Sequence, residues 1–239
     1  MATIDDVLKA TTDLNTAVST ECQRIEDKLN ELELYKSQLL ASYNAELARY
    51  QEDGWPPHFR LSRNQIGTVT EGILDYFSIV ADCDITFEVI RTIRTGIVWE
   101  DRDAEEQAIL SAMGKEGITH TLPEFNIIKM TWTKKLPKEN SRLFLQSVNY
   151  HTYVTHGSYA KLVQGNLRGS YFEGITNEWG LCGGTNLLTN ASYATPHPYA
   201  ETETGEVHFC LLGTLAGRFP IIRSKPRWGY FPYLQSILD

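Results

Sequence analysis

Apolar side chains recur along the first quarter of the chain in steps of three and four residues. The stripe runs from residue 4 to residue 47, and two consecutive steps of four, from Leu14 through Val18 to Cys22, interrupt an otherwise seven-residue repeat. Residues 1–53 contain no glycine and no proline. This pattern predicts one long uninterrupted helix with a left-handed supercoil that unwinds locally near Val18.

The predicted helix is too long to bury its stripe against a compact domain of the same chain. About 48 helical residues at 1.5 Å each reach roughly 70 Å, whereas the remaining domain is about 35–40 Å across. The stripe is therefore expected to pack against copies of itself. Its β-branched residues, together with polar Thr11, Asn15 and Lys36, favour a higher-order bundle, for which we expect a trimer. The residues expected at this interface are Ile4, Val7, Leu14, Val18, Cys22, Ile25, Leu29, Leu32, Leu39 and Tyr43.

The alternative is a helical hairpin that packs on the chain's own domain. This alternative needs a point at which the helix folds back, and residues 1–53 offer no glycine or proline for it. The helix is expected to end at the linker 54–57, where Gly54 allows a left-handed cap and Pro56 and Pro57 cannot continue the helical hydrogen bonds.

Beyond the linker, short β-branched and aromatic runs alternate with Gly, Asn and Pro. These runs predict strands at 65–70, 84–93, 97–99, 126–133, 141–155, 159–167 and 207–215. Within 126–133, apolar Ile128, Met130 and Trp132 alternate with polar neighbours. One short helix is predicted at 104–113, with Asp103 as its N-cap and Gly114 after it.

These elements predict an α+β protein, with a long N-terminal coiled-coil helix followed by a mainly antiparallel head that resembles a β-sandwich or jelly roll. The expected parts are a coiled-coil oligomerisation stalk at 1–53, a neck or small mixed α/β collar at 54–117, and a β-sandwich head with a C-terminal arm at 118–239. Pro220 and Pro226 exclude the arm from a central strand. We expect it to lie extended in a groove of its own head or of a neighbour.

Charge and cysteine usage narrow the functional classes. The 239 residues hold 22 Lys and Arg against 30 Asp and Glu, a net charge of −8, so electrostatic binding to nucleic acid is not expected. No secretory signal and no apolar run long enough to span a membrane is visible. The four cysteines, Cys22, Cys83, Cys182 and Cys210, are too widely spaced for a zinc site or a disulfide framework, which favours reduced thiols in a cytoplasm.

Signals of catalysis or metal binding are sparse. Cys182 lies in the glycine-rich segment 179–186 and resembles a nucleophile in a turn, but a flexible surface loop is the ordinary interpretation. His151 and His156 are expected on opposite faces of a strand, which excludes a shared metal. Helix capping explains the acidic run 99–106 better than a calcium site does. We therefore expect no catalytic residues, no metal and no cofactor.

Aromatic residues and carboxylates share the loop-rich region 170–206. Carboxylates such as Glu178 and Glu201 beside aromatic rings are typical of glycan binders and glycosidases, whereas core packing is the alternative for most of the rings. The arm adds basic residues that would complement an acidic surface. The residues singled out for ligand or partner binding are Trp179, Tyr193, Tyr199, Arg223, Arg227 and Trp228.

The helical stalk at 4–47, the proline-broken neck at 54–57 and the Gly/Asn-rich strand and loop pattern at 159–184 together resemble the trimeric fibre, whisker, collar and tail-attachment proteins of tailed bacteriophages. The resemblance covers the whole chain as an architecture. It implies a non-enzymatic virion protein made in the host cytoplasm, homotrimeric, and docked on other virion proteins, with a host-surface glycan as one candidate partner. The competing hypotheses are a carbohydrate-binding or glycan-hydrolysing protein oligomerised by its stalk, and an assembly scaffold that is absent from the mature particle.

Overall fold

The computed structural model describes residues 3–53, 59–121, 123–137, 139–149, 153–187 and 193–231, and for 43–53 it describes the backbone alone. The chain divides into two compact units, Met1–Gly54 and Trp55–Asp239. The boundary expected at residue 117 falls inside the second unit. Strand β4 (Cys83–Ile93), from the segment expected to form a neck, pairs along its length with β5 (Phe125–Lys134) from the segment expected to form the head.

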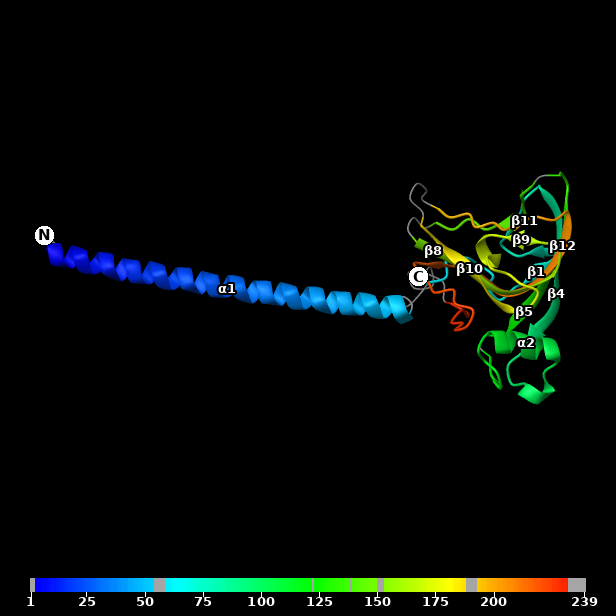
Figure 1. The fold of residues 1–239 in the computed structure, drawn as a ribbon, viewed down its shortest axis with the longest axis horizontal. Helices are drawn as coiled ribbons and strands as arrows, with labels where there is room; N and C mark the ends of the chain where they lie inside the picture. Colours follow the sequence, from blue (N-terminus) through cyan, green and yellow to red (C-terminus); the bar gives the residue numbers. More distant parts are fainter. Residues whose placement is uncertain are drawn as a thin grey trace. The chain divides into compact units, whose positions relative to one another are not determined.

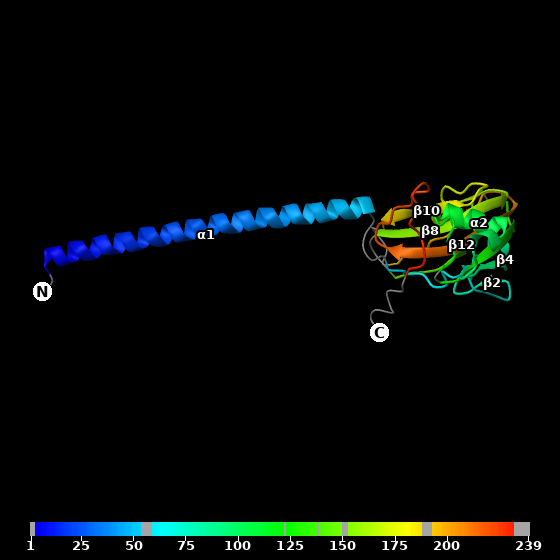
Figure 2. The ribbon, with the colours of Figure 1, turned by 90° about the horizontal axis from the view of Figure 1, so that it is seen from below.

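Helix α1 (Ile4–Asp53) makes up the first unit and is continuous over 50 residues (Figures 1 and 2). Thr3 and Asp6 cap its first turn reciprocally: the Thr3 amide donates to Asp6 Oδ2 at 2.9 Å, and the Asp6 amide donates to Thr3 Oγ1 at 3.3 Å. The prediction of one long helix is confirmed, and α1 contains no hairpin. Residues 54–57, which were expected to end the helix, lie outside the described residues.

The second unit is built on a five-stranded sheet in the order β10-β8-β12-β5-β4. Every neighbouring pair is antiparallel. The other three strands are β8 (Tyr153–Gln164), β10 (Gly180–Leu187) and β12 (Thr204–Ala216). The strands predicted at 84–93, 126–133 and 207–215 are confirmed, whereas the predicted break after residue 155 is wrong because β8 continues through Gly157.

The other described strands are short and pair outside this sheet. They are β1 (Val69–Thr70) with β2 (Ile73–Leu74), β3 (Ser78–Ile79) with β7 (Phe144–Leu145), and the trio β6 (Ser141–Arg142), β11 (Tyr199–Ala200) and β9 (Leu167–Arg168). The strand predicted at 97–99 is wrong, since Trp99 begins the 3-10 turn η1 (Trp99–Asp101). The long run predicted at 141–155 is instead divided among β6, β7 and the start of β8.

One hydrophobic cluster joins the large sheet to the short strands and to the 3-10 turn η2 (Ser170–Phe172). Ile128, Met130 and Trp132 of β5 all enter it, so the predicted alternation is confirmed. The aromatic rings of Phe144 and Tyr171 stack in its centre with their centroids 6.1 Å apart. Burial of such rings is the main source of stability in this unit.

A second cluster contains α2 (Ala104–Ala112) and the C-terminal segment 219–231. Asp103 caps α2 as predicted, because its Oδ1 accepts hydrogen bonds from the amides of Glu105 at 3.0 Å and Glu106 at 2.9 Å. Buried Arg102 pairs with Glu106 at 3.3 Å. Helix capping and ion pairing therefore use the acidic run at the start of this helix.

Candidate functional site

The apolar stripe of α1 is exposed along its described length. The exposed fractions are 81% for Ile4, 64% for Leu14 and 53% for Val18, and the rest of the stripe lies between 54% and 63%. Those other residues are Val7, Ile25, Leu29, Leu32 and Leu39, and Cys22 is exposed as well. The side chain of Tyr43 lies outside the described residues. A stripe this long and this exposed is a candidate interface.

Thr11 and Lys36 are two of the three polar residues expected along the stripe. The hydroxyl of Thr11 donates to the carbonyl oxygen of Val7 at 2.9 Å, so its polar atom is satisfied inside the helix and its methyl group remains available for packing. Lys36 places a basic side chain in the stripe, which costs stability in a coiled-coil core and constrains its register.

Trp228, expected in a binding surface, lies in the core of the second unit instead. It is 2% exposed, and its Nε1 donates to the carbonyl oxygen of Leu211 at 2.7 Å. The ladder between β12 and β8 is irregular between Cys210 and Gly213, where Leu211 has a φ of 50°. The C-terminal segment thus packs on its own unit, which is one of the two positions expected for the arm.

Trp179 and Arg223 also have structural partners. Trp179 Nε1 donates to Glu105 Oε1 at 2.8 Å, and Lys161 pairs with the same carboxylate at 2.7 Å. Burial alone would raise the pKa of Glu105, but these hydrogen bonds outweigh it and hold the pKa below its ordinary value. Arg223 donates to Thr176 Oγ1 at 2.7 Å and to the carbonyl oxygen of Glu178 at 3.0 Å, which fastens the turn before β10.

The remaining predicted binding residues, Tyr193, Tyr199 and Arg227, have different surroundings. Tyr193 and Arg227 are exposed. Tyr199 donates its hydroxyl proton to His197 Nε2 at 2.7 Å, since His197 Nδ1 donates to the carbonyl oxygen of Thr195 at 2.6 Å. The carboxylate of Glu201 pairs with Arg168 at 2.8 Å, so it is engaged within the fold.

The glycine-rich segment around Cys182 is strand β10 rather than a flexible loop. Cys182 is buried, and burial raises the pKa of its thiol to about 11, so the thiolate form is scarce at neutral pH. Burial likewise lowers the pKa of His156 to about 4. His151 lies outside the described residues. Among the residues that the structure describes, no group of three or more potential metal ligands is found.

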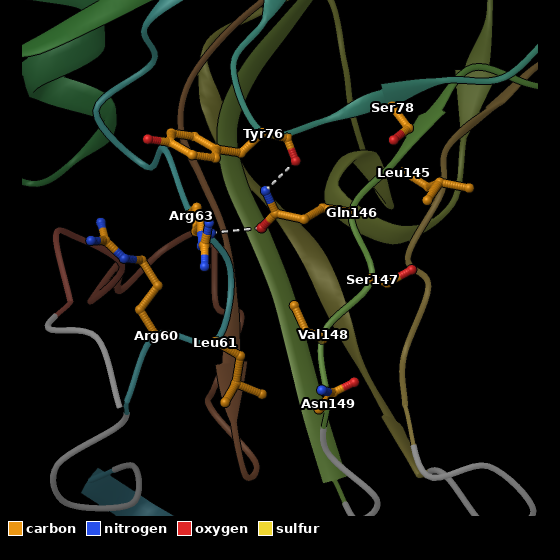
Figure 3. A pocket seen from close by; sticks show the side chains of 10 residues that line it. All are labelled: Arg60, Leu61, Arg63, Tyr76, Ser78, Leu145, Gln146, Ser147, Val148 and Asn149. Atoms are coloured by element: carbon orange, nitrogen blue, oxygen red, sulfur yellow. Dashed lines mark hydrogen bonds between the residues drawn. The ribbon is translucent and has the colours of Figure 1, made fainter. Parts of the chain in front are cut away.

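A pocket of about 420 Å³ lies between three segments of the second unit, 60–63, 76–78 and 145–149 (Figure 3). Gln146 joins all three segments. Its Oε1 accepts a hydrogen bond from the Arg63 amide at 2.6 Å, and its Nε2 donates to the carbonyl oxygen of Tyr76 at 2.7 Å. The described lining residues are Arg60, Leu61, Arg63, Tyr76, Ser78, Leu145, Gln146, Ser147, Val148 and Asn149.

Two arginines give this pocket its charge. Buried Arg60 donates to Gln65 Oε1 at 3.3 Å and lies 4.5 Å from the ring centroid of Tyr230. Exposed Arg63 lies 5.4 Å from the ring centroid of Tyr76. None of the described residues that line the pocket is acidic. The pocket is therefore suited to an anionic ligand.

Sequence reasoning missed this pocket. The residues joined by Gln146 lie 83 and 70 positions away from it in the chain, and no motif marks them. A local signal existed only in the two arginines of 60–63, directly after the linker.

Comparisons of the chain with protein-family models, with curated proteins and with solved structures gave no match. Within the described ranges, no helix combines the length and apolarity needed to cross a bilayer. The α1 stripe and the pocket are therefore the two candidate functional surfaces of the described chain.

Proposed function

We propose that the protein is an oligomeric structural component in which α1 forms a parallel trimeric coiled coil with α1 of two other copies. The observation that supports this proposal is the exposed, seven-residue-periodic stripe on a helix of 50 residues. Burying each of its leucine, isoleucine or valine side chains is worth about 1.5–3 kcal/mol. Association would therefore stabilise α1 substantially.

A second copy of α1 fits the stripe better than an unrelated partner does. Only a helix with the same repeat and the same interruption near Val18 keeps its own apolar residues in contact along the full length. Valine and isoleucine occupy both kinds of core position, as Val18 and Ile25 show, and β-branched residues at both kinds suit three strands, whereas Leu14, Leu32 and Leu39 suit two strands as well.

The second unit would then be displayed in three copies. A trimeric helix that carries a β-sandwich-like head is the architecture of phage fibre, collar and tail-attachment proteins, and we extend the proposal to that role in a virion. The extension is tested separately, by mass spectrometry of purified particles, and the absence of the chain from mature particles would favour an assembly scaffold.

Site-specific crosslinking tests the parallel arrangement. In a Cys22→Ser background, Leu14→Cys places one thiol on the stripe, and Thr12→Cys places one on the opposite side of the same turn. Oxidation should give disulfide-linked dimers for Leu14→Cys and not for Thr12→Cys, because identical stripe positions meet only in a parallel, in-register bundle. Light scattering should give three times the chain mass of 27.1 kDa.

Two results would overturn the proposal. One is a monomeric mass at all concentrations. The other is equal crosslinking of the two cysteine variants, since that would indicate random collision rather than a defined interface.

A further inference from the structure

The pocket at 60–63, 76–78 and 145–149 has a charge opposite to that of the whole protein. The chain carries a net charge of −8, yet the described lining holds Arg60 and Arg63 and no carboxylate. Arg60 is held by Gln65 and Tyr230, whereas the Arg63 side chain is exposed beside the pocket (Figure 3). Arg63 is therefore the cation available to a ligand, and a guanidinium recognises a carboxylate through paired hydrogen bonds.

Tyr76 is held in an unfavourable backbone conformation at this pocket. Its φ is 66°, in the left-handed region that a bulky residue rarely adopts, and its side chain is 64% exposed. Hydrogen bonds fix the segment around it: Gln146 Nε2 binds its carbonyl oxygen, and Asn64 Nδ2 donates to the carbonyl oxygen of Asp75 at 3.0 Å. The fold thus presents an aromatic ring to solvent at a conformational cost, and such strain concentrates at ligand sites.

The rest of the lining is mixed in polarity. Ser78, Ser147 and Asn149 carry hydroxyl and amide groups, while Leu61, Leu145 and Val148 supply apolar surface. A saccharide matches such a lining, because its hydroxyl groups need donors and acceptors and its C–H faces pack on apolar and aromatic groups. The volume of about 420 Å³ falls in the usual range for small-molecule sites, about 300–1,000 Å³.

We propose that this pocket binds a carboxylate-bearing saccharide, with Arg63 on the carboxylate and the Tyr76 ring against the sugar. An inorganic anion would bind the Arg63 guanidinium but would make no use of the Tyr76 ring or of the apolar lining residues. A neutral sugar would leave the positive charge without a counterpart.

Binding of methyl glucuronide to the full-length chain tests this proposal. The matched probe is the methyl ester of the same glucuronide, which differs in having no charge. Calorimetry or saturation-transfer NMR should show the acid binding about tenfold more tightly than the ester, the usual effect of one hydrogen-bonded charge. The pocket lies in the second unit, so this outcome is independent of trimer formation.

Three variants locate the site. Arg63→Ala should weaken binding of the acid about tenfold and leave binding of the ester unchanged. Tyr76→Gly should weaken both probes, while glycine keeps the backbone conformation at a φ of 66°. Lys225→Ala removes an exposed cation outside the pocket lining and should change neither. Thermal unfolding of each variant checks that the fold is intact.

Several results would overturn the proposal. The first is no binding of the acid at about 10 mM, a concentration at which even a ligand with a Kd of about 1 mM would bind most of the protein. The second is equal binding of acid and ester. The third is unchanged affinity for the acid in Arg63→Ala or Tyr76→Gly. Inorganic phosphate that competes with the same affinity as the glucuronide would also overturn it, because the site would then be a simple anion site.

Discussion

Burial decides how the titratable side chains of the second unit ionise. His156 is enclosed by β8, the ring of Tyr171 and Thr214, whose Oγ1 lies 3.1 Å from its Nδ1. Because the charged imidazolium would lose its hydration there, the pKa falls from 6.5 to about 4. The spacing of His151 and His156 spoke against a shared metal, and the environment makes His156 a neutral hydrogen-bonding group.

This burial makes stability depend on pH. The unfolded chain protonates His156 near pH 6.5 and the folded chain only near pH 4, so stability is complete above pH 6.5 and is lost as the pH falls between these values. The loss should be about 3 kcal/mol, because the pKa falls from 6.5 to about 4 and each tenfold change in proton affinity corresponds to about 1.4 kcal/mol. Urea unfolding followed by tryptophan fluorescence measures it, since residues 1–53 contain no tryptophan.

His156→Gln should remove this pH dependence. His120→Gln is the matched control, because His120 is exposed. The lowered pKa of Glu105 adds a further loss of stability at lower pH, as its carboxylate is protonated. A slope between pH 6.5 and 4 that is the same in His156→Gln and in the unmodified protein would contradict the effect assigned to His156.

At the scale of elements, a row of glycines explains how the C-terminal segment is held. Gly183, Gly157 and Gly213 lie opposite one another on β10, β8 and β12. A Cβ on Gly157 would lie 3.0 Å from the indole ring of Trp228, and a Cβ on Gly213 would lie 3.5 Å from the same ring. The missing side chains of Gly157 and Gly213 leave room on the sheet for the indole of Trp228.

Gly157→Ala should therefore destabilise the second unit by about 1–3 kcal/mol, the usual cost of overpacking a core. Gly184→Ala is the matched control in β10, because a Cβ there meets nothing within 4 Å. Chemical unfolding gives the free energies, and the change in indole fluorescence reports displacement of Trp228. Equal destabilisation by both substitutions would show that strand propensity, rather than contact with Trp228, causes the loss.

At the scale of the whole molecule, the two units have different sources of stability. The described residues of the second unit form three buried clusters of their own. In the proposed assembly, α1 buries its stripe only by association, so its unfolding is linked to protein concentration. Helix propensity alone does not provide comparable stability.

Thermal unfolding of the full-length chain should therefore show two transitions. The helical circular dichroism signal of α1 should melt at a temperature that rises with protein concentration, while the tryptophan signal should melt at a constant one. Leu29→Asp should abolish the dependence of the α1 melting temperature on protein concentration and leave the tryptophan transition unchanged. Thr16→Asp, outside the stripe, should have little effect. A single transition that does not depend on concentration would contradict this separation.

Local sequence patterns were sufficient to predict several of the elements. The repeat of three and four residues without glycine or proline predicted α1, Asp103 and Gly114 predicted the ends of α2, and alternation predicted the buried face of β5. Each of these depends on neighbours within a few residues in the chain. The glycines of β8 and β10 were misleading for the same reason, since glycine favours turns locally. The contact between Gly157 and Trp228 is visible only in the folded chain.

The sequence by itself determined the two kinds of unit, the long amphipathic helix and most strands of the large sheet, because periodicity and capping are properties of contiguous residues. The tertiary structure alone decided that Trp228 and Trp179 are buried, that Arg223 fastens a turn, and that Arg63, Tyr76 and Gln146 meet at one pocket. These contacts join residues tens of positions apart. Strand register and side-chain packing place them, and neither is encoded in the local pattern of any one segment.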